Sequence, residues 1–204
     1  ILSELESDVN GHFTVTVPSE SVRASAVLRT DGSASVFDCE SRGDLECFTD
    51  HLNGELSSLE PCESPDVYGV ANLGFTPFPL NPDAVAHVTA FVVAQKTRNW
   101  FEALQPTFTG LERELPILVN GIGGAAYSFP WKAILLSPQS TSERNSSIST
   151  VVSHEYGHFL FDQILERHYG TLEEGDFNEG MADVVSSLVW DTPIMGQGYW
   201  LDDD

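Results

Sequence analysis

A pair of histidines four residues apart, His154 and His158, constrains this fold most. On a helix, residues at this spacing lie on one face about 5–6 Å apart, so both imidazoles can bind one metal ion. Glu155 is turned about 100° from His154 around the helix, where it can flank the ion and hold a metal-bound water as a general base does. A structural zinc site normally fills its fourth position with a protein ligand, commonly Cys, and no Cys follows Cys62. A site with an open water position fits better.

A second helix is predicted to return toward this histidine pair. Asp176 and Glu179 have the spacing of a capping box, so we expect this helix to begin near Asp176. The short connection brings Glu179 back as a third ligand, with Asn178 beside it. Asp183 lies four residues after Glu179 on the same face, where it can accept the other ring N–H of His154. The alternative is that the histidine spacing is accidental and Glu179 only caps a helix; the conjunction of both features favours a catalytic zinc site.

The charge of the chain excludes two classes of partner. Its 204 residues include 31 Asp and Glu against 9 Lys and Arg, a formal net charge of −22. Such acidity repels nucleic acid and anionic membrane surfaces, so we expect neither as a partner. No apolar run reaches the length of a membrane span, about 18 residues. The glycine-rich segment 121–124 lacks the spacing of a phosphate-binding loop, so we expect backbone flexibility or close approach there and no nucleotide site.

Three cysteines, Cys39, Cys47 and Cys62, cluster in one polar stretch. In an exported protein this pattern indicates one disulfide and an odd thiol. A cysteine metal site is the alternative, although the sequence contains no Cys-x-x-Cys pair. The chain starts at Ile1 without an initiator Met, and it is strongly acidic. We therefore expect a mature or excised piece of a secreted or extracellular protein.

Periodicity along the chain predicts an α+β fold. Residues 1–80 are expected to be β-rich, with an unassigned polar segment at 38–65. The apolar spacing over 83–104 predicts a long helix with Asn81 as its cap. His87 within that helix is expected to be structural. The further elements that we expect are strands at 12–17, 24–28, 33–37, 115–119 and 133–136 and a helix over 149–168.

The segments at 154–158 (HEYGH) and 178–183 (NEGMAD) resemble the gluzincin pattern. They are most similar to those of the thermolysin-like and fungalysin-like neutral metalloendopeptidases. The resemblance covers about residues 81–204 and implies a zincin core there, with a long helix, a mixed sheet and two metal-bearing helices. It also implies that this chain holds the N-terminal lobe of a catalytic domain, with the C-terminal helical lobe missing. We therefore predict two regions, a β-rich N-terminal region at 1–80 and the zincin core at 81–204.

The same resemblance implies roles for residues outside the zinc motif. Ala125, Ala126 and Tyr127 correspond to the edge strand that pairs with the substrate backbone, and adding a strand to an exposed edge holds a peptide extended. Tyr169 lies eleven residues after His158, where thermolysin-like enzymes place a Tyr whose hydroxyl stabilises the oxyanion. The alternative for Tyr169 is aromatic packing at a helix end.

The function expected from these observations is zinc-dependent hydrolysis of peptide bonds by an endopeptidase. His154, His158 and Glu179 hold zinc in this hypothesis. Glu155 takes a proton from the zinc-bound water and passes it to the leaving amine. The acidic run 202–204 lies where relatives carry calcium, so Ca²⁺ is a second candidate ion. The expected partners are a peptide or protein substrate and further domains of the same polypeptide. The alternative is a non-catalytic extracellular binding or structural module that retains the metal site.

Overall fold

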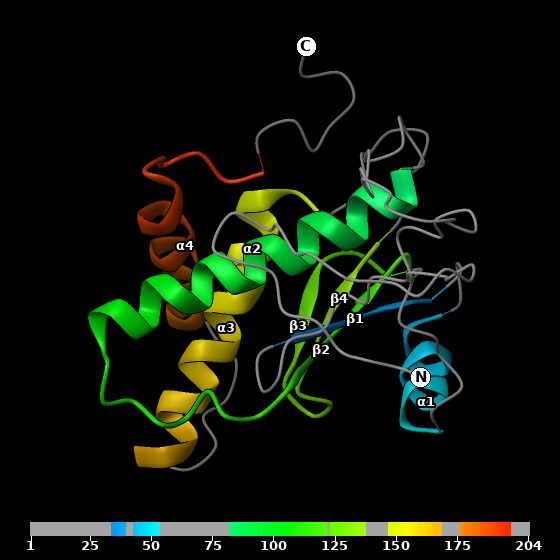
Figure 1. The fold of residues 1–204 in the computed structure, drawn as a ribbon, viewed down its shortest axis with the longest axis horizontal. Helices are drawn as coiled ribbons and strands as arrows, with labels where there is room; N and C mark the ends of the chain where they lie inside the picture. The colour runs from blue at the N-terminus through cyan, green and yellow to red at the C-terminus, as the bar shows by residue number, and fades with distance from the viewer. Residues whose placement is uncertain are drawn as a thin grey trace, which may run out of the picture. The chain divides into compact units, whose positions relative to one another are not determined.

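The computed structural model describes the parts of the chain that carry the predicted metal residues. The described residues are 34–39, 43–53, 82–121, 123–137, 147–168 and 176–196. They form β1 (Ala34–Asp38), α1 (Asp44–Asn53), α2 (Pro82–Leu104), β2 (Leu115–Val119), β3 (Ala126–Ser128), β4 (Ala133–Leu136), α3 (Ser149–His168) and α4 (Asp176–Trp190) (Figure 1). The α+β fold class is confirmed. All described residues belong to one compact unit made of Val27–Pro61 and Phe78–Asp204, and the division predicted at residue 80 stays a prediction.

The four described strands form one mixed sheet. Their order is β1-β2-β4-β3, with β1, β2 and β4 parallel and β3 antiparallel to β4. The register places Val36 opposite Ile117 and Ile117 opposite Ile134. Ile134 in turn lies opposite Tyr127. One row of side chains therefore crosses the whole sheet and ends on β3, the edge strand.

Most predicted elements lie close to their expected bounds. The long helix and the two metal-bearing helices are α2, α3 and α4. The strands predicted at 115–119 and 133–136 are β2 and β4. The strand predicted at 33–37 is β1, which pairs with β2. The strands predicted at 12–17 and 24–28 lie outside the described residues.

Alternating side chains of the sheet enter two separate cores. Ile117 and Ile134 are fully buried on the face that α2 and α3 cover. Leu118 and Leu135 point to the opposite face, where they pack with residues of α1. This is the alternation expected of strands buried on both faces. It places α1 and α3, the helix predicted to carry two metal ligands, on opposite faces of the sheet.

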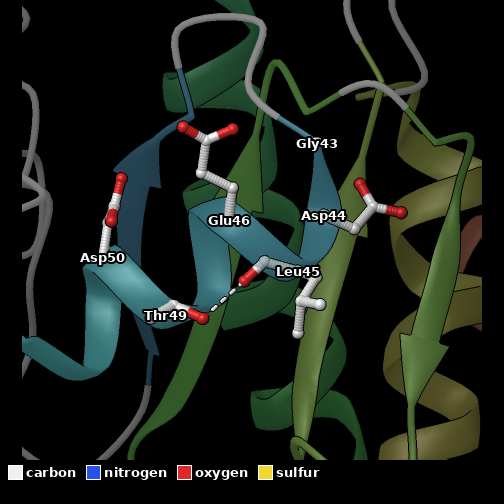
Figure 2. A pocket seen from close by; sticks show the side chains of 6 residues that line it. All are labelled: Gly43, Asp44, Leu45, Glu46, Thr49 and Asp50. Carbon is white, nitrogen blue, oxygen red and sulfur yellow. Dashed lines mark hydrogen bonds between the residues drawn. The ribbon is translucent and has the colours of Figure 1, made fainter.

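The sequence does not predict α1, because its segment is polar and the partners that stabilise it are distant. Cys47 of α1 is bonded to Cys39, which follows β1, with their Cα atoms 5.3 Å apart. The prediction of a disulfide among the three cysteines is therefore confirmed, and the structure supplies the pairing that the sequence left open. Phe48 stacks on Trp131 with ring centroids 4.7 Å apart. Cys62 lies outside the described residues. Figure 2 shows a shallow hollow along α1 that is lined by Gly43, Asp44, Leu45, Glu46, Thr49 and Asp50.

The glycine-rich segment after β2 makes a close backbone approach, one of the two roles expected of it. A Cβ atom on Gly123 would overlap the carboxylate of Asp44 at the start of α1. Gly124 has a φ of +119°, in the left-handed region that favours glycine. The segment thereby turns the chain from β2 toward the edge strand β3.

The helices α3 and α4 pack antiparallel and unusually close. A Cβ atom on Gly157 of α3 would lie 2.8 Å from the Cα atom of Ala182 on α4, so glycine is what permits this approach. The hydroxyl of Ser186 on α4 donates to the carbonyl of Thr150 on α3 over 2.8 Å. The long helix α2 crosses and contacts both (Figure 1). None of the helices in the described part of the chain combines the length and apolarity that a membrane span requires.

Candidate metal centre

Three side chains from α3 and α4 converge at one point. The Nε2 atoms of His154 and His158 are 3.0 Å apart. Glu179 places Oε2 3.1 Å from the Nε2 atom of His154 and Oε1 3.5 Å from that of His158. One ligand atom from each of the three residues lies within 4.8 Å of the other two. Among the described residues, this is the only such group of His, Cys, Asp or Glu side chains.

The outer nitrogen of each histidine ring has an acceptor from α4. His154 Nδ1 lies 2.8 Å from Oδ1 of Asp183. His158 Nδ1 lies 3.1 Å from Oδ1 of Asn178. Because both partners are acceptors, each Nδ1 carries the proton, and each Nε2 presents a lone pair. The structure therefore brings the two predicted orienting residues to the two predicted histidine ligands.

The donor chemistry of this site fits a metal cation. His154 Nε2 lies within hydrogen-bond distance of both His158 Nε2 and the Glu179 carboxylate. In the protonation described above, none of these three groups has a proton to donate to another. Such an arrangement is repulsive unless a cation or a proton occupies its centre. Two histidines, one carboxylate and an open position form a ligand set of catalytic zinc sites, whereas structural sites are closed by four protein ligands. The side chain of Glu179 is 66% exposed, so solvent can reach the candidate metal site from the Glu179 side.

Glu155 is a buried carboxylate beside the metal residues. It is only 6% exposed. The pKa of Glu155 is raised to about 8, mainly by burial; a hydrogen bond from the backbone of Tyr127 acts to lower this pKa, and the nearby Glu179 carboxylate acts to raise it. A bound divalent cation would lower the pKa of Glu155. Glu155 thus projects from α3 and is bonded to the backbone of the edge strand.

The edge strand contributes a backbone group to the site and a side chain to the core. Ala126 is exposed and Ala125, just before β3, is half-buried. The Ser128 carbonyl accepts from the backbone N–H of Lys132 in the turn to β4, so by alternation the backbone groups of Tyr127 face away from β4. The Tyr127 N–H accordingly reaches Glu155. The Tyr127 side chain, by contrast, is 5% exposed and packs in the core, away from the open edge of the strand.

Tyr127 is anchored on α3 through a buried acidic residue. Its hydroxyl donates to Oδ2 of Asp162 over 2.6 Å, and Lys132 Nζ donates to the same oxygen over 2.5 Å. Lys132 also pairs with Glu166 at 3.5 Å. Burial and the hydrogen bond to Asp162 raise the pKa of Tyr127 above its ordinary value, so the phenol stays protonated. This network fastens the edge strand and its turn onto the metal helix.

Sequence reasoning missed Asp162 and Lys132. Asp162 lies four residues after His158, so helical spacing on the metal helix was a signal that could have found it. Lys132 is 30 residues from Asp162 and carries no local signal. Tyr169 lies outside the described residues, and its predicted role stays a prediction. His87 is fully buried in α2.

Comparison with known proteins finds a solved structure with a similar fold but no matching family. No family model matches the chain, and no curated protein matches its sequence. Among solved structures, the chain is similar to the precursor of protealysin, a metalloproteinase from Serratia proteamaculans, with 16% identity and a TM-score of 0.48. The match covers 80% of this chain and 45% of that structure, so this chain spans less than half of its length. At this level the likeness supports neither an activity nor a site residue, and the case for function depends on the site itself.

Proposed function

We propose that the chain is a zinc-dependent peptide-bond hydrolase, an endopeptidase of the thermolysin-like or fungalysin-like gluzincin type. The observation that carries the proposal is the convergence of His154, His158 and Glu179, with both outer ring nitrogens held by acceptors. Holding Nδ1 protonated is how proteins orient a histidine toward a metal through Nε2. In this proposal His154, His158 and Glu179 are the zinc ligands, and Asn178 and Asp183 orient the histidines.

Glu155 is the general base in this proposal. Zinc, when bound, would supply a Lewis acid that polarises a water and the scissile carbonyl. Glu155 accepts a proton from the attacking water and later donates it to the leaving amine. Its support is its burial beside the ligands and its backbone hydrogen bond from Tyr127, which limits its orientation. Tyr169 is proposed as a donor to the oxyanion.

The substrate is proposed to add an extended strand along the edge of β3. That edge carries the backbone carbonyl of Tyr127, which does not face β4, and Ala126 leaves it uncovered by a bulky side chain. Backbone pairing at a sheet edge holds a peptide without reading its side chains. Ala125, Ala126 and Tyr127 therefore act through their main chain.

The proposed setting of the enzyme is extracellular. The Cys39–Cys47 disulfide is typical of proteins that work in oxidising surroundings. A net charge of −22 disfavours nucleic acid as a partner, so a peptide or protein substrate and further domains of the same polypeptide remain the proposed partners. Calcium at the acidic run 202–204 is proposed as a second ion; that run lies outside the described residues.

Hydrolysis of a quenched peptide, measured together with zinc content, tests the proposal. Glu155→Gln is expected to keep zinc and to lower kcat/KM by about 10²–10⁴-fold, the usual contribution of a general base. His158→Ala is expected to lose both zinc and hydrolysis. Glu102→Gln makes the same chemical change on α2 and is the matched control, expected to alter neither. Undiminished hydrolysis by the Glu155→Gln variant would contradict the proposed role of Glu155 as the general base.

A further inference from the structure

A directed chain of hydrogen bonds joins the three long helices next to the metal residues. Trp190 Nε1 on α4 lies 2.8 Å from Oγ of Ser153 on α3. Ser153 Oγ lies 2.9 Å from Oγ1 of Thr97 on α2, and Thr97 Oγ1 donates to the Val93 carbonyl over 2.9 Å. The indole N–H can only donate and the carbonyl can only accept. Every proton in the chain therefore points from α4 through α3 to α2.

The two hydroxyl groups in this chain of hydrogen bonds are buried, and each has both a donor and an acceptor. Ser153 and Thr97 are both 0% exposed. Lys96 Nζ on α2 lies over the Trp190 ring, 3.4 Å from its centroid, in a cation–π contact. Removing the Thr97 hydroxyl would leave the buried Ser153 hydroxyl without its acceptor, which costs more than an exposed hydrogen bond is worth. Nothing in the proposed catalytic steps uses these residues.

Ser153 directly precedes His154 on α3. Contacts of Ser153 that fix the rotation of α3 about its axis therefore also fix the direction in which His154 and His158 point. Apolar packing around α3 is non-directional and tolerates small rotations of the helix. Hydrogen bonds weaken steeply with misalignment, and Ser153 is bonded to α4 on one side and to α2 on the other. Turning α3 about its axis would strain these bonds and would also move His154 relative to Asp183.

We propose that Ser153 is a positioning residue of the metal centre, which locks α3 in the rotation at which His154 and His158 face Glu179. This inference rests on the proposed metal function. Its consequence is that Ser153 sets metal affinity although it touches neither the metal ligands' side chains nor the substrate. A merely structural serine would change only the stability of the fold.

Cobalt and zinc affinity of the purified chain, measured by competition with a coloured chelator, tests this role. Ser153→Ala is expected to weaken the binding of both ions by about tenfold, the lower end of the range for groups that orient metal ligands. Ser186→Ala is the matched control. Ser186 is also 0% exposed and also links α4 to α3, but its bond ends on the Thr150 carbonyl and does not reach α2. It is expected to lower the melting temperature and leave metal affinity unchanged.

Two further variants keep the inference testable if Ser153→Ala folds poorly. Thr97→Val removes the next hydroxyl in the chain and is expected to weaken metal binding, and Thr97→Ser restores that hydroxyl and is expected to restore affinity. Wild-type metal affinity in both Ser153→Ala and Thr97→Val would overturn the positioning role while leaving the proposed function intact. A wild-type chain that binds neither ion would overturn the proposed function, and the inference with it.

Discussion

Replacing Gly157 by alanine should separate α3 and α4, the two helices that carry the candidate metal centre. The added Cβ would lie 2.8 Å from the Cα atom and 3.2 Å from the carbonyl oxygen of Ala182. Favourable contacts between carbon atoms are about 3.5–4.0 Å, so α3 and α4 must move apart by roughly 1 Å. Both obstructing atoms belong to the backbone, so no side-chain rotation relieves the overlap.

That displacement is large compared with the tolerance of the hydrogen bonds between the helices. His154 Nδ1 to Asp183 is 2.8 Å, and His158 Nδ1 to Asn178 is already 3.1 Å. An added 1 Å or so takes both beyond hydrogen-bond range. Loss of groups that orient metal ligands typically costs about 10–100-fold in metal affinity, which is the loss expected here.

The same substitution has two opposing effects on the free energy of unfolding. Overpacking against backbone costs about 3 kcal/mol, the upper part of its usual range. Alanine in place of a helical glycine returns about 1 kcal/mol. Gly157→Ala should therefore lower the free energy of unfolding of the metal-free chain by about 2 kcal/mol, measured by urea denaturation.

Gly180 supplies the control, because it lies in α4 and a Cβ atom there would meet nothing within 4 Å. Gly180→Ala should raise the free energy of unfolding by up to about 1 kcal/mol and leave zinc affinity unchanged. If Gly157→Ala matched Gly180→Ala in both stability and zinc affinity, the close approach of α3 and α4 could not be what positions the ligands.

Two other predictions concern the elements around the site. Asp162→Asn takes the charge from the acceptor shared by Tyr127 and Lys132 and should lower the free energy of unfolding by about 1.5–3 kcal/mol; an unchanged urea midpoint would contradict the network. Replacing Cys39 and Cys47 together by alanine removes a cross-link between residues eight apart, worth about 2.5 kcal/mol by loop entropy, and thermal melting should show this loss. Zinc affinity of the cysteine variant should stay unchanged because α1 and α3 lie on opposite faces of the sheet, and a large loss of affinity would contradict that separation.

The elements that the sequence predicts well are those whose signals are local. Helix α3 follows from helical spacing, and it occupies the predicted residues 149–168. Strands β2 and β4 follow from short apolar runs. Helix α1 was missed because its stability is not local. Its Leu45 and Leu52 are exposed, and it is held by a disulfide and by stacking on Trp131.

The candidate site divides in the same way. The positions of His154, His158 and Glu179 follow from spacing within two helices, and so does that of Asp183. The contacts of Ser153 do not, because its partner Thr97 is 56 residues away and only the crossing of α2 over α3 brings them together. Spacing along one helix carries no information about which other helix crosses it.

The claim on which all of this depends is that His154, His158 and Glu179 hold one zinc ion. X-ray absorption at the zinc edge of the reconstituted chain tests it directly. We expect one zinc per chain, a first shell of nitrogen and oxygen at about 2.0–2.2 Å, and the outer-shell scattering of two imidazoles. A sulfur scatterer at about 2.3 Å, or no zinc retained after reconstitution, would contradict the proposed site.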